Sequence, residues 1–309
     1  MKLSIVTTLF RSEEYVYEFY ERSSVVAKEV VGDNYEIIFV NDGSPDASLE
    51  KALELHYKYP NVKVIDLSRN FGHHEAMMTG LAHAVGEEVF LIDSDLEEEP
   101  EWLVEFFNRK SKANLDVVYG VQKDRRDSGL SKIAGAIFYR IFRLLTEVDQ
   151  PDNIVTARLM SRRYVEALLL NSERELNIGG LWISTGFDQE ALEVVKLATS
   201  ETTYSFSGKL GHLVNAITSF SSKPLYYTIY LGLTISLCSM LFVAWLIINY
   251  LFLSRPIDGF TTVVVSIWLL GGIIIALMGV QGIYIAKIFS EVKMRPRTII
   301  KKKYVSKAE

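Results

Sequence analysis

The sequence predicts an α/β domain with a mostly parallel sheet, followed by two membrane-spanning helices. Three observations indicate this. Short β-branched runs alternate with helical patterns over residues 1–121, two long uncharged runs lie near the C-terminus, and basic residues gather around those runs. Alternating strands and helices are typical of a parallel sheet that helices cover on both faces. The 309 residues leave room for about two domains.

Five short runs are predicted strands because β-branched and other strand-forming residues dominate them. They cover residues 3–8, 36–41, 62–67, 88–93 and 116–121. Apolar residues at helical spacing predict helices after the first four of these runs. The helices cover residues 13–30, 46–57, 72–85 and 101–112. The run 3–8 is too short for the core of a signal peptide, so we expect a cytoplasmic domain over residues 1–207.

Residues 225–252 and 261–286 contain no charged side chain. Each run exceeds the ~20 residues that cross ~30 Å of hydrocarbon. Buried core helices are the alternative, but two such runs in tandem with aromatic ends favour membrane spans. Lys223 precedes the first run, and basic residues of the segment 287–309 follow the second. The positive-inside rule therefore predicts a multi-pass plasma-membrane protein with both termini in the cytoplasm.

Two segments next to these features mix apolar stripes with basic residues. They are residues 129–147 and 208–223, for which we expect amphipathic helices in the membrane interface. Packing against the soluble domain is the alternative. The basic tail 287–309 favours anionic lipid head groups or is a plain topology signal. The single cysteine, Cys238, lies in a predicted span, which excludes a disulfide framework and a cysteine metal site.

Polar side chains follow the predicted strands, at Thr8, Asn41–Ser44, Ser68–Asn70 and Asp93–Asp95. Ligands of parallel sheets bind beyond the carboxyl ends of the strands, where these residues meet. Asp93 and Asp95, at i and i+2, can hold a hard cation against a diphosphate, so we predict a Mg²⁺ or Mn²⁺ site. No G-x-G-x-x-G follows the first strand and no P-loop motif occurs, which disfavours both a dinucleotide site and a P-loop NTPase.

The consecutive residues His73, His74 and Glu75 are poor metal ligands, because adjacent helical side chains point about 100° apart. We expect them to begin a helix that lines the site. The net charge is −5, and we expect no nucleic-acid partner.

The motif order I-V-T-T-L-F-R-S-E-E, V-N-D-G-S, L-S-R-N-F-G and D-S-D-L-x-x-x-P-E resembles the inverting family 2 glycosyltransferases of GT-A (Rossmann-like) fold. Residues 157–163, 217–225 and 291–296 are similar to segments of the polyisoprenyl-phosphate glycosyltransferases. This group includes the GtrB-type enzymes and is related to dolichol-phosphate mannose synthase. The resemblance covers nearly the whole chain, both predicted spans included.

The resemblance implies transfer of a sugar from a nucleotide diphosphate sugar, a UDP-sugar, to polyprenyl (undecaprenyl) phosphate. The transfer would invert the anomeric carbon at the cytoplasmic membrane face and serve the modification of cell-envelope glycans. The resemblance also implies a homotetramer. Metal would bind Asp95 with Asp93 nearby. Nucleotide-sugar contacts would come from Thr8, Glu13, Asp42, Arg69, Asn70 and Asp93. For Asp42, an Asx turn with Gly43 is the alternative, and both can hold together.

A lipid phosphate is already a nucleophile near neutral pH, because its second pKa is near 6. The enzyme must supply positioning and positive charge, for which an arginine fork is suited. We predict that Arg158 holds this phosphate as a catalytic residue, although pairing with a carboxylate such as Asp152 is the alternative. The further acceptor residues are Lys209, Arg126, Arg140 and Tyr204.

The sequence departs from the family pattern at three places. Thr156 replaces the aspartate of D-F-R-L-M, residues 202–204 read T-T-Y in place of S-K-Y, and residues 97–99 read E-E-E in place of Q-D-P. One alternative function is a polysaccharide or glycolipid synthase that acts on a sugar hydroxyl, which would need a general base. Another is a catalytically weak nucleotide-sugar-binding scaffold subunit. The Asp93/Asp95 pair and Arg158 favour an enzyme.

Overall fold

In a computed structural model of the chain, the structure describes residues 1–122, 153–171, 178–197, 218, 221–253 and 259–305. The chain divides into two compact units, of which the first comprises residues 1–139, 148–205 and 295–309 and the second residues 140–147 and 206–294. Several predictions lie outside the described residues. They concern the amphipathic segment 129–147, nearly all of segment 208–223, and Arg126, Arg140, Asp152, Tyr204 and Lys209.

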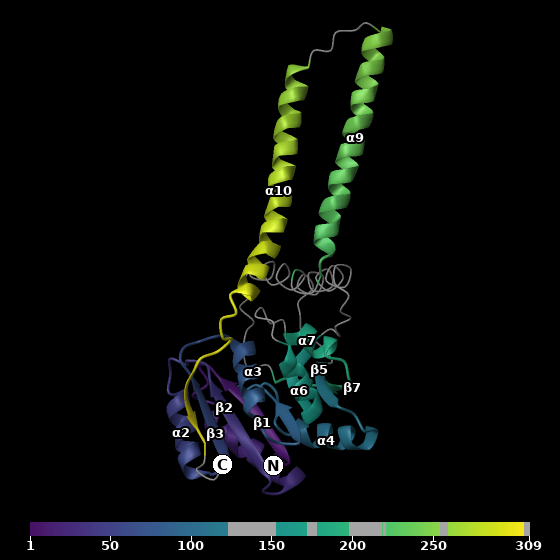
Figure 1. Cartoon of the computed structure of the whole chain (residues 1–309). Coiled ribbons are helices and arrows are strands. Elements are labelled where there is room, and N and C mark those ends of the chain that lie inside the picture. The colour runs from purple at the N-terminus through teal and green to yellow at the C-terminus, as the bar shows by residue number, and fades with distance from the viewer. Residues whose placement is uncertain (123–152, 172–177, 198–217, 219–220, 254–258, 306–309) are drawn as a thin grey trace. The chain divides into compact units, whose positions relative to one another are not determined.

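The first unit is built on an eight-stranded sheet of order β7-β5-β6-β4-β1-β2-β3-β8. Figure 1 labels β1, β2, β3, β5 and β7 of this sheet. Its strands are β1 (Leu3–Leu9), β2 (Tyr35–Asn41), β3 (Val62–Leu67), β4 (Glu88–Leu91), β5 (Val117–Gln122), β6 (Ile154–Ser161), β7 (Gln189–Val194) and β8 (Ile300–Tyr304). β6 and β8 run antiparallel to their neighbours, and the other strands are parallel to one another. The predicted α/β class with a mostly parallel sheet is confirmed.

Helices cover both faces of this sheet. They are α1 (Val16–Val31), α2 (Ser48–Lys58), α3 (His73–His83), α4 (Trp102–Ala113), α6 (Arg162–Leu170) and α7 (Ile178–Ser184). Residues of α1, α2 and α4 belong to one buried cluster, whereas residues of α3, α6 and α7 belong to a second cluster on the opposite face. The four predicted helices are present, each shorter than expected at its N-terminal end.

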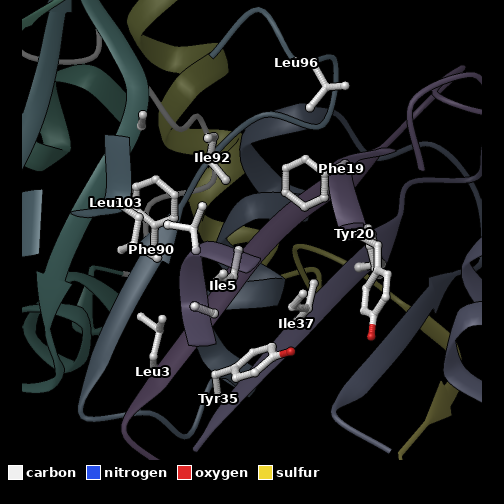
Figure 2. Close-up of a cluster of buried hydrophobic side chains, with 14 of the residues drawn as sticks. Leu3, Ile5, Phe19, Tyr20, Tyr35, Ile37, Phe90, Ile92, Leu96 and Leu103 are labelled. Atoms are coloured by element: carbon white, nitrogen blue, oxygen red, sulfur yellow. The ribbon is translucent and has the colours of Figure 1, made fainter. Parts of the chain in front are cut away.

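The first buried cluster shows how the strands and helices fit together (Figure 2). Ile5 of β1 pairs in register with Ile37 of β2, and Phe19 of α1 packs against the same cluster. Phe19 also meets Phe39 edge to face, with ring centroids 5.9 Å apart. Burying one such side chain contributes about 1.5–3 kcal/mol, so this layer fixes the strands that carry the site.

The second unit contains the helices α9 (Lys223–Leu253) and α10 (Phe260–Val292). Both contain a stretch long and apolar enough to cross a membrane. They include the predicted spans 225–252 and 261–286 and extend beyond them at both ends. Within this unit the Tyr284 hydroxyl donates a hydrogen bond to the Ser221 carbonyl over 2.7 Å.

The segment 287–309 differs from the expected basic tail. α10 continues to Val292, and residues 300–304 form β8, which pairs antiparallel with β3 at the edge of the sheet (Figure 1). The Ser68 backbone N–H extends this pairing by donating to the Ile299 carbonyl over 2.9 Å. A lysine-rich strand suits an edge because its charged side chains discourage further strand addition.

Candidate active site

Alternation along the strands brings three predicted residues to one side of the sheet. Val6, Val40 and Leu91 all point into the cluster beneath α3. Side chains two residues further along a strand point to the same face. Thr8, Asp42 and Asp93 therefore emerge on the α3 side at the carboxyl edge, where sequence analysis expected a ligand.

Asp93 is held by side chains from two other elements. Its Oδ1 lies 3.1 Å from Nε2 of His73, whose Nδ1 lies 3.0 Å from the Thr8 hydroxyl. Burial acts to raise the pKa of Asp93, but hydrogen bonds with His73 and Thr156 outweigh it and hold that pKa below its usual range. His73 is the first residue of α3, so a helix N-terminus lines the site as predicted.

Asp95 sits in a tight turn just beyond Asp93. Its Oδ1 accepts a hydrogen bond from the Glu97 backbone N–H over 3.0 Å, and Leu96 between them adopts a left-handed φ of 59°. Burial, and then the negative charge of Asp93, raise the pKa of Asp95. A bound cation would relieve both costs, and carboxylate oxygens are the ligands that Mg²⁺ and Mn²⁺ take.

The two carboxylates of Asp93 and Asp95 supply only part of the ligands that such a cation needs. Among the described residues, no group of three His, Cys, Asp or Glu side chains could hold a metal ion. The two aspartates would therefore supply the protein's share of the ligands, with a diphosphate and water completing the shell, as is common for Mg²⁺.

Asp42 joins the two loops that follow β2 and β3. Its carboxylate oxygens accept the backbone N–H groups of Phe71 at 2.7 Å and Gly72 at 3.0 Å. The turn in N-D-G-S is instead closed by Asn41, whose Oδ1 accepts the Ser44 N–H at 3.2 Å. The Asx-turn alternative thus belongs to Asn41, and nucleotide contact by Asp42 stays a prediction.

Gly43 allows these loops to pack closely. Its φ is +60°, and a Cβ atom there would lie 2.5 Å from the carbonyl carbon of Arg69 and from the backbone nitrogen of Asn70. The exposed side chains of Arg69 and Asn70 therefore lie beside the β2 turn. Glu13 lies at the same carboxyl edge of the sheet, where its Oε2 accepts a hydrogen bond from the Ala47 N–H over 3.0 Å.

Arg158 lies away from solvent. In the antiparallel pairing of β4 with β6 it lies opposite Leu91, and it is 1% exposed. The guanidinium lies over the Trp182 ring and donates to the Thr156 carbonyl at 3.2 Å, and burial lowers its pKa to about 9. With 1% of its surface exposed, the side chain offers no surface to a phosphate in this arrangement. The acceptor role of Arg158 therefore stays a prediction that this arrangement does not favour.

Glu98 and Lys196, for which the sequence indicated no role, lie next to Thr156. Continuing the β4–β6 register by two residues sets Thr156 opposite Asp93. Buried Glu98 accepts the backbone N–H groups of Thr156 at 3.0 Å and Ala157 at 2.7 Å, and it pairs with Lys196 at 3.2 Å. Burial, reinforced by the charge of Asp93, raises the pKa of Glu98 to about 7.

A cavity of about 230 Å³ adjoins this cluster, lined by Glu98, Gln122, Asn153, Ile154, Val155, Thr156 and Lys196. The one sequence feature that could have pointed to Glu98 was that residues 97–99 read E-E-E where the family pattern has Q-D-P. No local pattern pointed to Lys196, because only the pairing of β7 beside β5 brings it here.

Residues 4–169 match the family described as glycosyl transferase family 2. A Mycobacterium tuberculosis protein named among the glycosyltransferases is 48% identical over 99% of this chain and 89% of its own. The Shigella flexneri SfII prophage-derived bactoprenol glucosyl transferase is 36% identical over 98% of this chain and 99% of its own. The chain belongs to glycosyl transferase family 2, and it is a glycosyltransferase.

A solved structure agrees with the fold. The mannosyltransferase PcManGT from Pyrobaculum calidifontis, in complex with GDP-Man and Mn²⁺, matches with a TM-score of 0.50 at 16% identity. The match covers 70% of this chain and 62% of that chain. The predicted GT-A architecture is confirmed at the level of the fold.

Proposed function

We propose that the protein transfers a sugar from a nucleotide diphosphate sugar, a UDP-sugar, to the phosphate of a polyprenyl lipid. One observation carries this proposal: a single chain combines the Asp93/Asp95 pair at a sheet edge with two helices apolar enough to span a bilayer. That combination suits one water-soluble and one lipid substrate. Similarity to a bactoprenol glucosyl transferase over 98% of this chain, α9 and α10 included, supports the lipid acceptor.

The donor would bind along the carboxyl edge, over Thr8, Glu13, Asp42, Arg69, Asn70 and Asp93. Arg69 and Asn70 offer exposed groups for the nucleotide beside the β2 turn. Asp42 already accepts two backbone hydrogen bonds, and its remaining lone pairs would reach the base or ribose.

Asp95, with Asp93 nearby, is the proposed site of Mg²⁺ or Mn²⁺. When bound, such a cation neutralises charge on the departing nucleoside diphosphate. The chain's own contribution is to orient the two carboxylates, through the Glu97 N–H for Asp95 and through His73 for Asp93.

In the reaction, an oxygen of the lipid phosphate attacks the anomeric carbon as the bond from that carbon to the diphosphate breaks. The configuration inverts, and no proton has to be removed from the nucleophile above its second pKa near 6. The proposed positive and polar contacts to the acceptor are Lys209, Arg126, Arg140 and Tyr204. Arg158 would join them only after a rearrangement that exposes its guanidinium.

The connectivity supports a membrane hairpin. The chain leaves the first unit before α9 and rejoins its sheet at β8 after α10, so two crossings return it to the same side of a bilayer. We place that unit and both termini in the cytoplasm, at the plasma membrane, because nucleotide sugars are cytoplasmic. A homotetramer and a role in cell-envelope glycan modification complete the proposal.

One observation favours transfer to a sugar hydroxyl instead. Glu98 is a buried carboxylate with a pKa raised to about 7, next to Thr156, and a group of this kind can act as a general base. The proposal and this alternative differ in the bond that is formed.

The test incubates membranes that contain the protein with radiolabelled UDP-sugars and polyprenyl phosphate. We expect lipid-extractable label that survives mild base and is released by mild acid, as a sugar phosphodiester should be. Label in a polymer or in an acid-stable glycolipid would favour the hydroxyl acceptor. Membranes carrying Asp95→Asn serve as the negative control.

A further inference from the structure

The cavity beside Thr156 lies at the same edge as the proposed donor site. Gln122 ends β5, Ile154 begins the antiparallel β6, and Lys196 follows the end of β7. Because β5 and β7 run parallel to β4, these positions share the edge that carries Asp93. Thr156 connects the two regions, since it lines the cavity and hydrogen-bonds Asp93.

The lining of the cavity is polar but balanced in charge. Gln122 and Asn153 contribute amides and Thr156 a hydroxyl. The one cation of the described lining, Lys196, lies 3.2 Å from Glu98 and 3.5 Å from Glu97. Among the described residues that line the cavity, no positive charge is left over for an anion, and the carboxylates of Glu98 and Glu97 would repel one.

The volume of the cavity further limits the ligands that it can hold. At about 230 Å³ the cavity is smaller than the roughly 300–1,000 Å³ of pockets for drug-sized molecules. It therefore suits a single ring and not a nucleotide. Alternating donors and acceptors on such a ring match the amides, the hydroxyl and the ammonium of the lining.

We propose that this cavity is the sugar subsite of the donor, that it selects an uncharged hexose, and that Lys196 is a specificity-determining residue. Lys196 would donate to a ring hydroxyl while Glu98 and Glu97 hold its ammonium in place. Glu98 also fixes the backbone at Thr156 and Ala157, so the wall of the subsite and its cation are set by one buried carboxylate. This inference rests on the proposed function, whose donor it specifies.

The test measures binding of UDP, UDP-glucose and UDP-glucuronate to the detergent-solubilised full chain by calorimetry in the presence of Mg²⁺. The wild type should bind UDP-glucose more tightly than UDP, whereas the uronate, with its added carboxylate, should gain nothing over UDP. Lys196→Met should weaken UDP-glucose binding roughly 10- to 100-fold, the effect of losing one hydrogen bond from a charged group. UDP binding should change less than about twofold.

Lys110→Met is the matched control. Lys110 is also largely buried and paired with a carboxylate, Glu88 at 2.8 Å, but Glu88 lies at the amino end of β4. This variant should leave both ligands unaffected. Should Lys196→Met fail to fold, Gln122→Ala at the strand end must show the same selective loss for UDP-glucose.

Three results would overturn the inference: equal losses for UDP and UDP-glucose, no loss for either, or a preference for the uronate. None of these three results contradicts the proposed function if radiolabelled sugar is still transferred to the lipid phosphate. If the wild-type protein bound neither UDP nor UDP-glucose, the proposal that a UDP-sugar is the donor would be wrong, and the inference about the cavity would be wrong with it.

Discussion

At the scale of single residues, Asp95 combines burial, a neighbouring like charge and a fixed orientation. Asp95→Asn removes the charge and keeps the shape, so we expect transfer to fall by at least about 10³-fold, because several kcal/mol of charge stabilisation is lost. The free energy of unfolding should change by less than about 1 kcal/mol, since the side chain is only half-buried and an asparagine oxygen can still accept the Glu97 N–H. Radiolabel transfer and thermal denaturation measure the two effects.

Asp33→Asn is the matched control for that substitution. Asp33 is a carboxylate whose side chain is 94% exposed in the turn after α1, and its change should affect neither rate nor stability. Near-normal transfer by Asp95→Asn with Mg²⁺ present would show that the metal assignment is wrong.

The second prediction concerns Glu98 and pH. A lipid-phosphate acceptor loses nucleophilicity as it gains a proton, so the rate should fall as pH decreases through about 6. A general base at Glu98 must be deprotonated to act, so it would give a fall centred near its raised pKa of about 7. We expect the midpoint near 6 in the wild type and the same midpoint in Glu98→Gln, whatever the absolute rate. A midpoint near 7 that disappears in Glu98→Gln would contradict the account.

The positions of some site residues could be predicted from the sequence, whereas the surroundings of others could not, for a physical reason. Thr8, Asp42 and Asp93 follow parallel strands, and the ends of such strands meet at one edge whatever the details of packing. The burial of Arg158 and the contacts of Glu98 depend on β6 running antiparallel between β4 and β5. That long-range register has no local sequence signal.

At the scale of elements, the strands that sequence analysis expected are those with β-branched runs. β8 was missed because I-K-K-K-Y has the composition of a charged tail, and only the open edge of β3 makes it a strand. β7 was missed similarly, since its sequence Q-E-A-L-E-V favours a helix. In both cases tertiary pairing overrides local preference.

The third prediction tests β8. Deleting residues 300–309 removes the pairing with β3 and leaves the β3 backbone at Ile65 and Leu67 unpaired at a sheet edge. We expect the first unit to lose roughly 2 kcal/mol or more of stability and β3 amides to exchange faster, as measured by hydrogen exchange of the full-length chain and its deletion. Lys301→Ala is the control, because this exposed lysine contributes only a 3.6 Å ion pair with Asp66. Unchanged exchange in β3 after the deletion would show that β8 does not support the sheet.

At the scale of the whole molecule, the hairpin α9–α10 interrupts a unit that begins and ends on the same sheet. The fourth prediction follows for the chain in its membrane, starting from a Cys238→Ser background. A cysteine at position 254 should react with an impermeant maleimide from outside intact cells, and one at position 306 should react only after lysis. The reverse labelling pattern would put the donor site on the side that lacks nucleotide sugars and would contradict the proposed function.

The central claim is inverting transfer to a lipid phosphate, and nuclear magnetic resonance of the purified product tests it most directly. The purified full-length protein would be incubated with Mg²⁺, polyprenyl phosphate and an α-linked UDP-hexose. Phosphorus and proton spectra would then give the linkage and the anomeric configuration. The account predicts a phosphodiester between the lipid and a β-linked sugar, made by the wild type and not by Asp95→Asn. An α-linked product, or a sugar joined to a hydroxyl with the lipid phosphate still a monoester, would contradict it.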